Sequence, residues 1–177
     1  MKNFIAAAVI AAFAAGCQHG ARESAAPEPL QATAALQPTK GSKAFGEATF
    51  EQAGERVHVL VNAQGLKPNQ EHGFHIHEAG DCSSGDGMSA KGHFNPAGKP
   101  HGNPASSEHH AGDLPALKAD EHGHAKLDAM LEGLTVAPAP NSIVGRGLII
   151  HAEPDDYKTQ PTGNSGARIA CGVIKPS

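Results

Sequence analysis

The stretch RVHVLVNA, residues 56–63, has a regular alternation of apolar and other residues, and the prediction of the fold class starts from it. Val57, Val59 and Val61 occupy every second position, so one face of the extended chain is uniformly apolar. In a β-strand successive side chains point to opposite faces, and this period of two is therefore the signature of a half-buried strand. The stretch predicts a strand that packs one face against a core.

Other short segments on both sides of this stretch have the same character. Turn residues such as Gly54, Asn69 and Gly133 separate them, and no stretch has the periodicity of an amphipathic helix. Many short strands joined by polar turns predict an all-β fold, an antiparallel sandwich or barrel. The further strands expected are 44–51, 71–77, 125–130, 148–151 and 167–174.

The N-terminus predicts a leader sequence of the lipoprotein type, residues 1–16. Lys2 precedes an apolar run from Phe4 to Ala15, which is too short to span a membrane and remain there. The run ends in AAGC, residues 14–17, which resembles a bacterial lipobox in which cleavage exposes Cys17 for lipidation. An ordinary signal peptide cleaved nearby is the alternative, since its small residues would serve equally. Either reading predicts export, and lipidation would hold the protein on the periplasmic side of a bacterial membrane or at the cell surface.

The remaining chain divides into a tether and one domain. Residues 17–41 are rich in Ala, Pro, Gln and Thr, have no aromatic side chain and are expected to be a disordered tether. The folded domain is expected over 42–177. A formal charge of -4 gives the chain no general attraction for nucleic acid, and contact with a membrane is expected only through the N-terminal lipid.

Three cysteines are an odd number for an exported chain, where thiols normally pair. If Cys17 carries lipid, Cys82 and Cys171 are left as a pair. Two free buried thiols are the alternative, and they would be unusual in an oxidising compartment.

Histidines and one aspartate gather in three places, and their number exceeds what one metal needs. His75 and His77 lie two apart on an expected strand, so both side chains leave the same face. Four ligands complete a closed zinc site, whereas seven residues are available here. They suggest two adjacent metals with one shared ligand: His75, His77, His93, His101, His110, Asp113 and His151.

At this point the chain resembles the copper,zinc superoxide dismutases across the whole expected domain. The resemblance is carried by GFHIH (73–77), GHFNP (92–96), HAGDLP (110–115) and GARIACGVI (166–174), in that order. It implies a Greek-key β-barrel or sandwich with long metal-binding and active-site loops. It also implies one copper and one zinc per subunit, and a monomer or a homodimer.

The resemblance implies a role for each site residue. Copper would be held by His75, His77, His93 and His151, and zinc by His93, His101, His110 and Asp113, with His93 bridging the two ions. Asp155 would accept hydrogen bonds from one histidine of each metal, and Arg168 would attract the anion. The implied reaction is dismutation of superoxide, with His93 also transferring a proton.

Two further expectations follow. Only eleven residues separate Asp156 from Arg168, fewer than in longer family members, and Lys158 is the single cation among them. Positive charge that attracts superoxide is therefore expected from Lys91, unless that lysine is an ordinary solvated side chain. A non-enzymatic copper- or zinc-binding or delivery module of the same fold is the competing function, although such modules typically lack copper ligands or the arginine.

Overall fold

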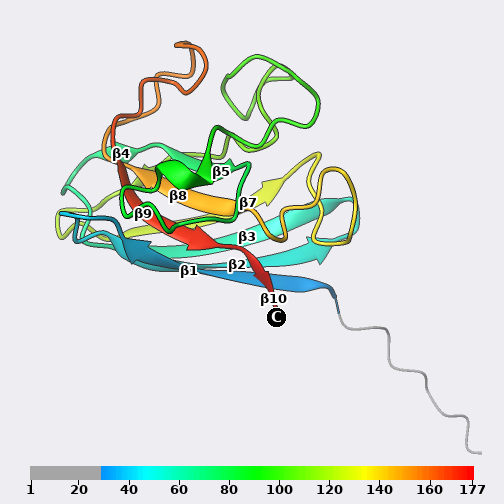
Figure 1. Ribbon diagram of the computed structural model, residues 1–177, viewed down its shortest axis with the longest axis horizontal. Coiled ribbons are helices and arrows are strands. Elements are labelled where there is room, and N and C mark those ends of the chain that lie inside the picture. Colours follow the sequence, from blue (N-terminus) through cyan, green and yellow to red (C-terminus); the bar gives the residue numbers. More distant parts are fainter. Residues whose placement is uncertain (1–28) are drawn as a thin grey trace, which may run out of the picture.

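The computed structural model describes residues 29–177, and Figure 1 shows them as an antiparallel β-structure with long loops on one side. The expected leader and residues 17–28 of the expected tether, including Cys17, lie outside the described residues. One short 3₁₀-helix, η1, spans Met88–Ala90. The strands are β1 Gln31–Pro38, β2 Phe45–Ala53, β3 Arg56–Gln64, β4 Glu71–His72, β5 Phe74–His77, β6 Leu117–Lys118, β7 Ala125–Leu131, β8 Gly147–His151, β9 Arg168–Val173 and β10 Lys175–Pro176.

The strands form one curled sheet in the order β5-β8-β9-β1-β2-β3-β7, with β10 paired to β1. Every pairing is antiparallel. The order is not sequential, because β5 pairs with β8 and β3 with β7, while β4 and β6 form a separate pair. Such crossovers between antiparallel neighbours are typical of Greek-key folds, so the expected fold class is confirmed.

Strand β1 corrects the expected domain boundary. The sequence analysis assigned residues 17–41 to a disordered tether, but Gln31–Pro38 pairs with β2, β9 and β10 inside the sheet. Ala32, Ala34 and Leu36 are buried and alternate with exposed residues, which is a strand pattern written mostly in alanine. Alanine and threonine give a weak apolar pattern in the sequence. The strand is stabilised by pairing with β2, β9 and β10 rather than by its local propensity. The folded domain therefore begins at least eleven residues before position 42.

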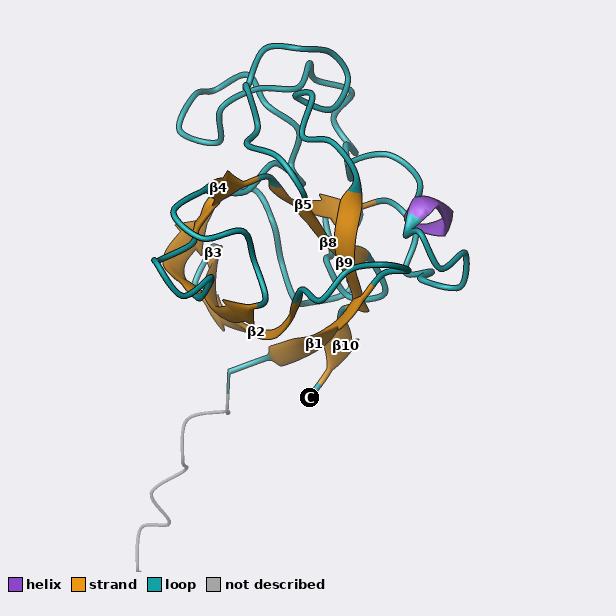
Figure 2. Cartoon of the chain, turned by 90° about the vertical axis from the view of Figure 1, so that its left-hand side faces the viewer, coloured by secondary structure: helices purple, strands orange, loops and turns teal. Residues whose placement is uncertain are grey.

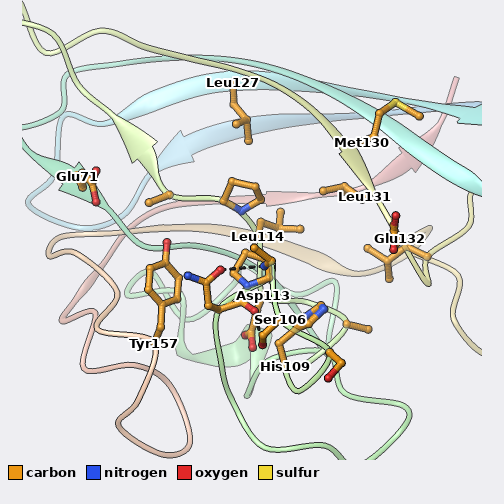
Figure 3. A pocket seen from close by; sticks show the side chains of 18 of the residues that line it. Glu71, Ser106, His109, Asp113, Leu114, Leu127, Met130, Leu131, Glu132 and Tyr157 are labelled. Atoms are coloured by element: carbon orange, nitrogen blue, oxygen red, sulfur yellow. Dashed lines mark hydrogen bonds between the residues drawn. The ribbon is translucent and has the colours of Figure 1, made fainter.

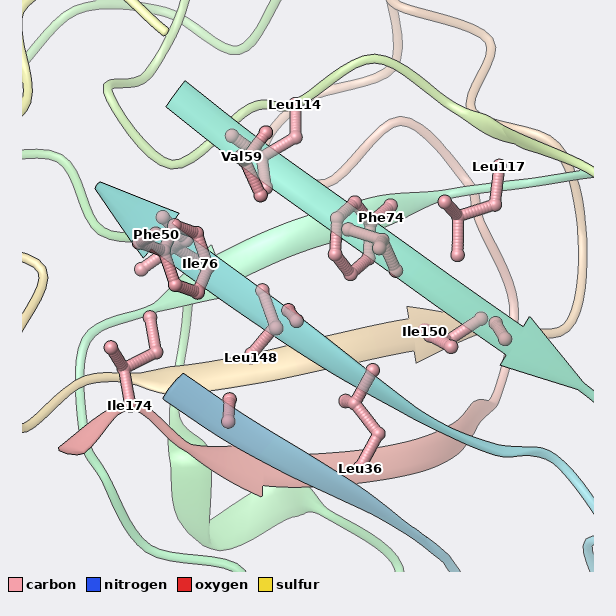
Figure 4. Close-up of a cluster of buried hydrophobic side chains, with 14 of the residues drawn as sticks. Leu36, Phe50, Val59, Phe74, Ile76, Leu114, Leu117, Leu148, Ile150 and Ile174 are labelled. Atoms are coloured by element: carbon pink, nitrogen blue, oxygen red, sulfur yellow. The ribbon is translucent and has the colours of Figure 1, made fainter. Parts of the chain in front are cut away.

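The core lies between the two sides of the curled sheet (Figure 4). Phe50 of β2 and Val59 of β3 face Phe74 and Ile76 of β5 across it, and each of these four side chains is fully buried. The alternation of β3 is as expected, since Val57, Val59 and Val61 are buried. This apolar contact anchors β5, the strand that also carries His75 and His77.

Two long loops rise on the same side of the strands, residues 78–116 and 152–167 (Figures 1 and 2). Residues 78–119 are largely a loop, interrupted by η1 and by β6. Within residues 29–177 no helix is long and apolar enough to cross a membrane.

Candidate metal centre

Strands β5 and β8 bring three of the expected ligands together. His75 and His77 project from the face of β5 opposite Phe74 and Ile76, as their spacing of two predicted. The pairing of β5 with β8 places His151, the last residue of β8, beside the start of β5, where its main-chain N–H donates to the Gly73 carbonyl at 2.8 Å. All three imidazoles are buried, with at most 4% of each residue exposed.

The loop over 78–116 returns along β5 and adds the other ligands. Isolated bridges pair His77 with His93 and His75 with Asp113. The Ile76 main chain extends this contact, because its N–H donates to the Gly112 carbonyl at 2.9 Å and its own carbonyl accepts from Phe94 N–H at 2.8 Å. The loop over 78–116 is therefore hydrogen-bonded to β5 next to His93 and Asp113, two of its expected ligands.

The seven residues expected from the sequence form two buried groups of four that share His93. One group is His75, His77, His93 and His151; the other is His93, His101, His110 and Asp113. Within each group the ligand atoms all lie within 4.8 Å of one another. Two of the ring nitrogens, His75 Nδ1 and His93 Nε2, are buried without any hydrogen-bond partner. A buried polar atom without a partner is costly, so these nitrogens fit a site that holds a metal ion.

In the all-histidine group, hydrogen bonds determine which ring nitrogen is free. His77 Nδ1 lies 2.8 Å from the Lys91 carbonyl and His151 Nδ1 lies 3.3 Å from the Gly166 carbonyl. A carbonyl oxygen can only accept, so each Nδ1 carries the hydrogen and each Nε2 keeps its lone pair. The two Nε2 atoms are 3.4 Å apart. Tetrahedral coordination with bonds of about 2.0–2.1 Å separates two ligand nitrogens by about 3.3 Å, so the spacing suits a shared ion.

The second group is built around the Asp113 carboxylate. Its Oδ1 lies 2.8 Å from His93 Nδ1 and 3.0 Å from His101 Nδ1, and its Oδ2 accepts from the main-chain N–H of Gly102 and His110. Burial alone would raise the pKa of Asp113, but hydrogen bonds from His101, His110 and His93 lower it well below its usual value. Three nitrogens and one ionised carboxylate form a donor set suited to zinc.

Three members of the all-histidine group, His77, His93 and His151, are held in the neutral form. Burial, and then the charges of neighbouring groups including Arg168, lower the pKa of His77 and of His151 well below the usual value. Burial likewise lowers the pKa of His93 to about 4. Neutral imidazole is the form that binds a metal, so these histidines are ready to bind near neutral pH.

Asp155 joins the two groups from the loop over 152–167. Its Oδ2 lies 2.7 Å from His75 Nε2 and its Oδ1 lies 2.9 Å from His101 Nε2. Burial would raise the pKa of Asp155, but hydrogen bonds from His101 and His75 lower it, so the carboxylate is an acceptor for both rings. It leaves the opposite nitrogen, Nδ1, of each histidine to face its own group.

Arg168 lies beside the all-histidine group, on the strand that the disulfide tethers. Cys82 and Cys171 are bonded, with their Cα atoms 5.9 Å apart. The Arg168 guanidinium donates to the Gly87 carbonyl at 2.6 Å and to the Lys91 carbonyl at 2.5 Å. Both acceptors belong to the loop closed by the disulfide, so the bridge and the arginine secure the same segment.

A cavity of about 920 Å³ lies next to Asp113 of the second group, between the loop over 78–116 and β7 (Figure 3). Leu114, Leu127, Met130 and Tyr157 line it together with Asp113. Its lining includes none of the six histidines of the two groups. This cavity is therefore not the approach to the all-histidine group.

Sequence reasoning missed the main-chain acceptors of the site. The Lys91 carbonyl binds both His77 and Arg168, and the Gly166 carbonyl binds His151. Every residue carries a carbonyl, so no sequence pattern marks these. Lys91 was expected only as a charge; its ammonium lies 3.8 Å from Glu78 Oε1, on the exposed surface.

Comparison with known proteins agrees with this geometry. The family model described as copper/zinc superoxide dismutase matches residues 44–174. Superoxide dismutase [Cu-Zn] 2 of Aquifex aeolicus is 43% identical over 152 residues, covering 84% of this chain and 88% of the relative. Superoxide dismutase [Cu-Zn] of Yarrowia lipolytica is 45% identical over 141 residues, covering 75% of this chain and 90% of the relative.

A solved structure is also similar. The crystal structure of the clock protein EA4 superposes with a TM-score of 0.76 at 38% identity, covering 85% of this chain and 97% of that chain.

Proposed function

This chain belongs to the copper/zinc superoxide dismutase family and catalyses the dismutation of superoxide, and from that premise we propose which of its residues hold the metals and carry the reaction. Copper is held by His75 Nδ1 and by Nε2 of His77, His93 and His151. Zinc is held by Nδ1 of His93, His101 and His110 and by Asp113 Oδ1. We call His75, His77 and His151 the copper half, and His101, His110 and Asp113 the zinc half, with His93 shared.

The unpaired nitrogens carry this assignment. His75 Nδ1 and His93 Nε2 are buried, have no hydrogen-bond partner and belong to the same group of four. Bound copper supplies the exchange of one electron with each superoxide, which zinc cannot supply because it has a single stable oxidation state.

His93 is the residue that can hold a proton between the two halves. Its Nδ1 is fixed 2.8 Å from Asp113, whereas its Nε2 faces the copper half without a partner. Dismutation consumes two superoxide ions and two protons and yields dioxygen and hydrogen peroxide. A proton held at Nε2 would be delivered where the second superoxide is reduced.

Arg168 receives the anion. A guanidinium has five N–H donors, and the carbonyls of Gly87 and Lys91 occupy only some of them. Its positive charge contributes to lowering the pKa of His77 and His151, so it is felt at the copper half. Lys91 adds a weaker positive charge, because Glu78 partly offsets it.

The test is superoxide dismutation by the purified chain loaded with copper and zinc. We expect His151→Ala to abolish copper-dependent activity while zinc still binds. Arg168→Ala should keep both metals and lose about tenfold or more of the rate, since local steering charge changes association rates by factors of ten to a thousand. Retention of full activity by His151→Ala would overturn the copper assignment.

The competing function, a non-enzymatic copper or zinc module, is not favoured. Its expected signature is the loss of copper ligands or of the arginine, and this chain retains all of them near one another. The relatives are named as dismutases.

We also propose that the protein is exported and held by lipid on Cys17, where it removes superoxide outside the cytoplasm. The disulfide and the bacterial relatives are consistent with an exported protein. Labelling cells with a radioactive fatty acid should mark the wild type and leave Cys17→Ser unmarked and released from the membrane fraction. Equal labelling of both would refute lipidation at Cys17.

A further inference from the structure

The side chain of Gln160, a residue outside the metal-binding motifs, binds the main chain of His101, the proposed zinc ligand. Gln160, from the loop over 152–167, accepts the His101 N–H at its Oε1, at 2.9 Å. Its Nε2 donates to the His101 carbonyl, also at 2.9 Å. The main-chain donor and acceptor admit only one orientation of the amide, so both bonds form together.

The same loop holds His101 at a second point. Asp155 Oδ1 lies 2.9 Å from His101 Nε2, so one loop fixes the ring while its tip fixes the main chain. Gly163 packs on that contact, because a Cβ there would overlap Asp155 Oδ1 and lie 2.5 Å from His101 Nε2. With a φ of +66°, this position also has the backbone conformation that glycine tolerates best.

The loop over 152–167 connects His151, a residue of the copper half, to Arg168. It begins after His151 and ends before Arg168. Its two arms are paired, with Ala152 N–H bonded to the Ala167 carbonyl at 2.7 Å and Asp156 N–H to the Gly163 carbonyl at 2.9 Å. Because the arms are paired, order at the tip of the loop also limits the motion of Ala167, the residue before Arg168.

We infer that Gln160 is a positioning residue that couples zinc binding at His101 to the order of the loop over 152–167. Bound zinc would fix the His101 ring and so limit the motion of the His101 main chain. Gln160 is bonded to that main chain, so the tip of the loop also becomes less mobile. The paired arms of the loop connect the tip to Arg168. The loop is short, with eleven residues between Asp156 and Arg168, so one bidentate contact can restrain its whole tip. The inference rests on the proposed zinc role of His101.

The experiment compares the full chain with Gln160→Met, which keeps the length of the side chain but has neither the donor nor the acceptor. Thr159→Ala is the matched control, because Thr159 Oγ1 bonds only within the loop, to Asp156 Oδ2 at 2.6 Å. Zinc affinity is measured against a competing chelator. Hydrogen exchange of residues 157–163 is followed with and without zinc.

We expect zinc to bind about tenfold more weakly to Gln160→Met, within the range found for residues that orient metal ligands. Zinc should slow exchange over 157–163 in the wild type and in Thr159→Ala but not in Gln160→Met. Unchanged affinity together with unchanged protection in Gln160→Met would overturn the role of Gln160. Failure of the wild type to bind zinc would instead overturn the ligand assignment itself.

Discussion

The copper half and the zinc half share His93 but are built by different means. His75, His77 and His151 stand on β5 and β8, strands whose opposite faces lie in the apolar core. The zinc half lies on the loop over 78–116, where hydrogen bonds to the Asp113 carboxylate, rather than strand pairing, hold the residues in place. Ligands on packed strands are preorganised, whereas ligands on a loop depend on polar contacts and on the ion itself.

The largest effect is expected from the residue that both halves share. Structural zinc sites gain roughly 10–16 kcal/mol on binding, so one of four ligands contributes about 3 kcal/mol. His93→Ala should therefore weaken both metals by more than about a hundredfold. His151→Ala is the control, because it should weaken copper alone. Titration of each variant with each metal measures this, and an effect of His93→Ala on one metal only would refute the shared ligand.

Removal of the disulfide should damage the copper half more than the zinc half. The bridge closes a separation of 89 residues, worth roughly 4–5 kcal/mol at most in the chain-entropy model. It also secures the segment whose carbonyls hold His77 and Arg168.

Cys82→Ser with Cys171→Ser should lower the free energy of unfolding by a few kcal/mol, measured by denaturant titration of the metal-loaded chain. The same variant should lose copper affinity while zinc affinity stays within a few-fold. Equal losses for the two metals would contradict the difference between the halves.

Asp155→Asn should affect both halves together, since one carboxylate binds a ring from each. An amide places an N–H against one of the two rings, so that hydrogen bond is lost, and its neutral oxygen accepts more weakly than a carboxylate from the other ring. Metal affinities should fall about 10–100-fold, as for other residues that orient ligands. Competition titrations check this, and a loss confined to one metal would contradict a joint role of Asp155 in the two halves.

The smallest effect is expected from Arg168→Lys, which concerns the anion rather than either metal. Lysine keeps the charge but cannot reach two carbonyls with a planar fork. The rate should fall a few-fold and still decrease with added salt, whereas Arg168→Ala should be slower and less sensitive to salt. Identical salt profiles for the two variants would argue against charge as the function of Arg168.

The strands with branched apolar side chains were predictable and β1 was not. Val57, Val59 and Val61 show their alternation in the sequence, whereas Ala32 and Ala34 bury so little surface that the same alternation resembles a polar tether. Strand β1 is stable because three partners supply its hydrogen bonds, which no local pattern reports.

The candidate ligands could be chosen from the sequence alone, because histidine and aspartate are chemically distinct from most other residues and their order along the chain does not depend on the fold. Which nitrogen of each ring is free depends on the folded chain, because carbonyls such as those of Lys91 and Gly166 bind the other nitrogen. The fold also brings Gln160 to His101, across 59 residues of chain. Main-chain groups are the same at every residue, so only their positions in space give them a role.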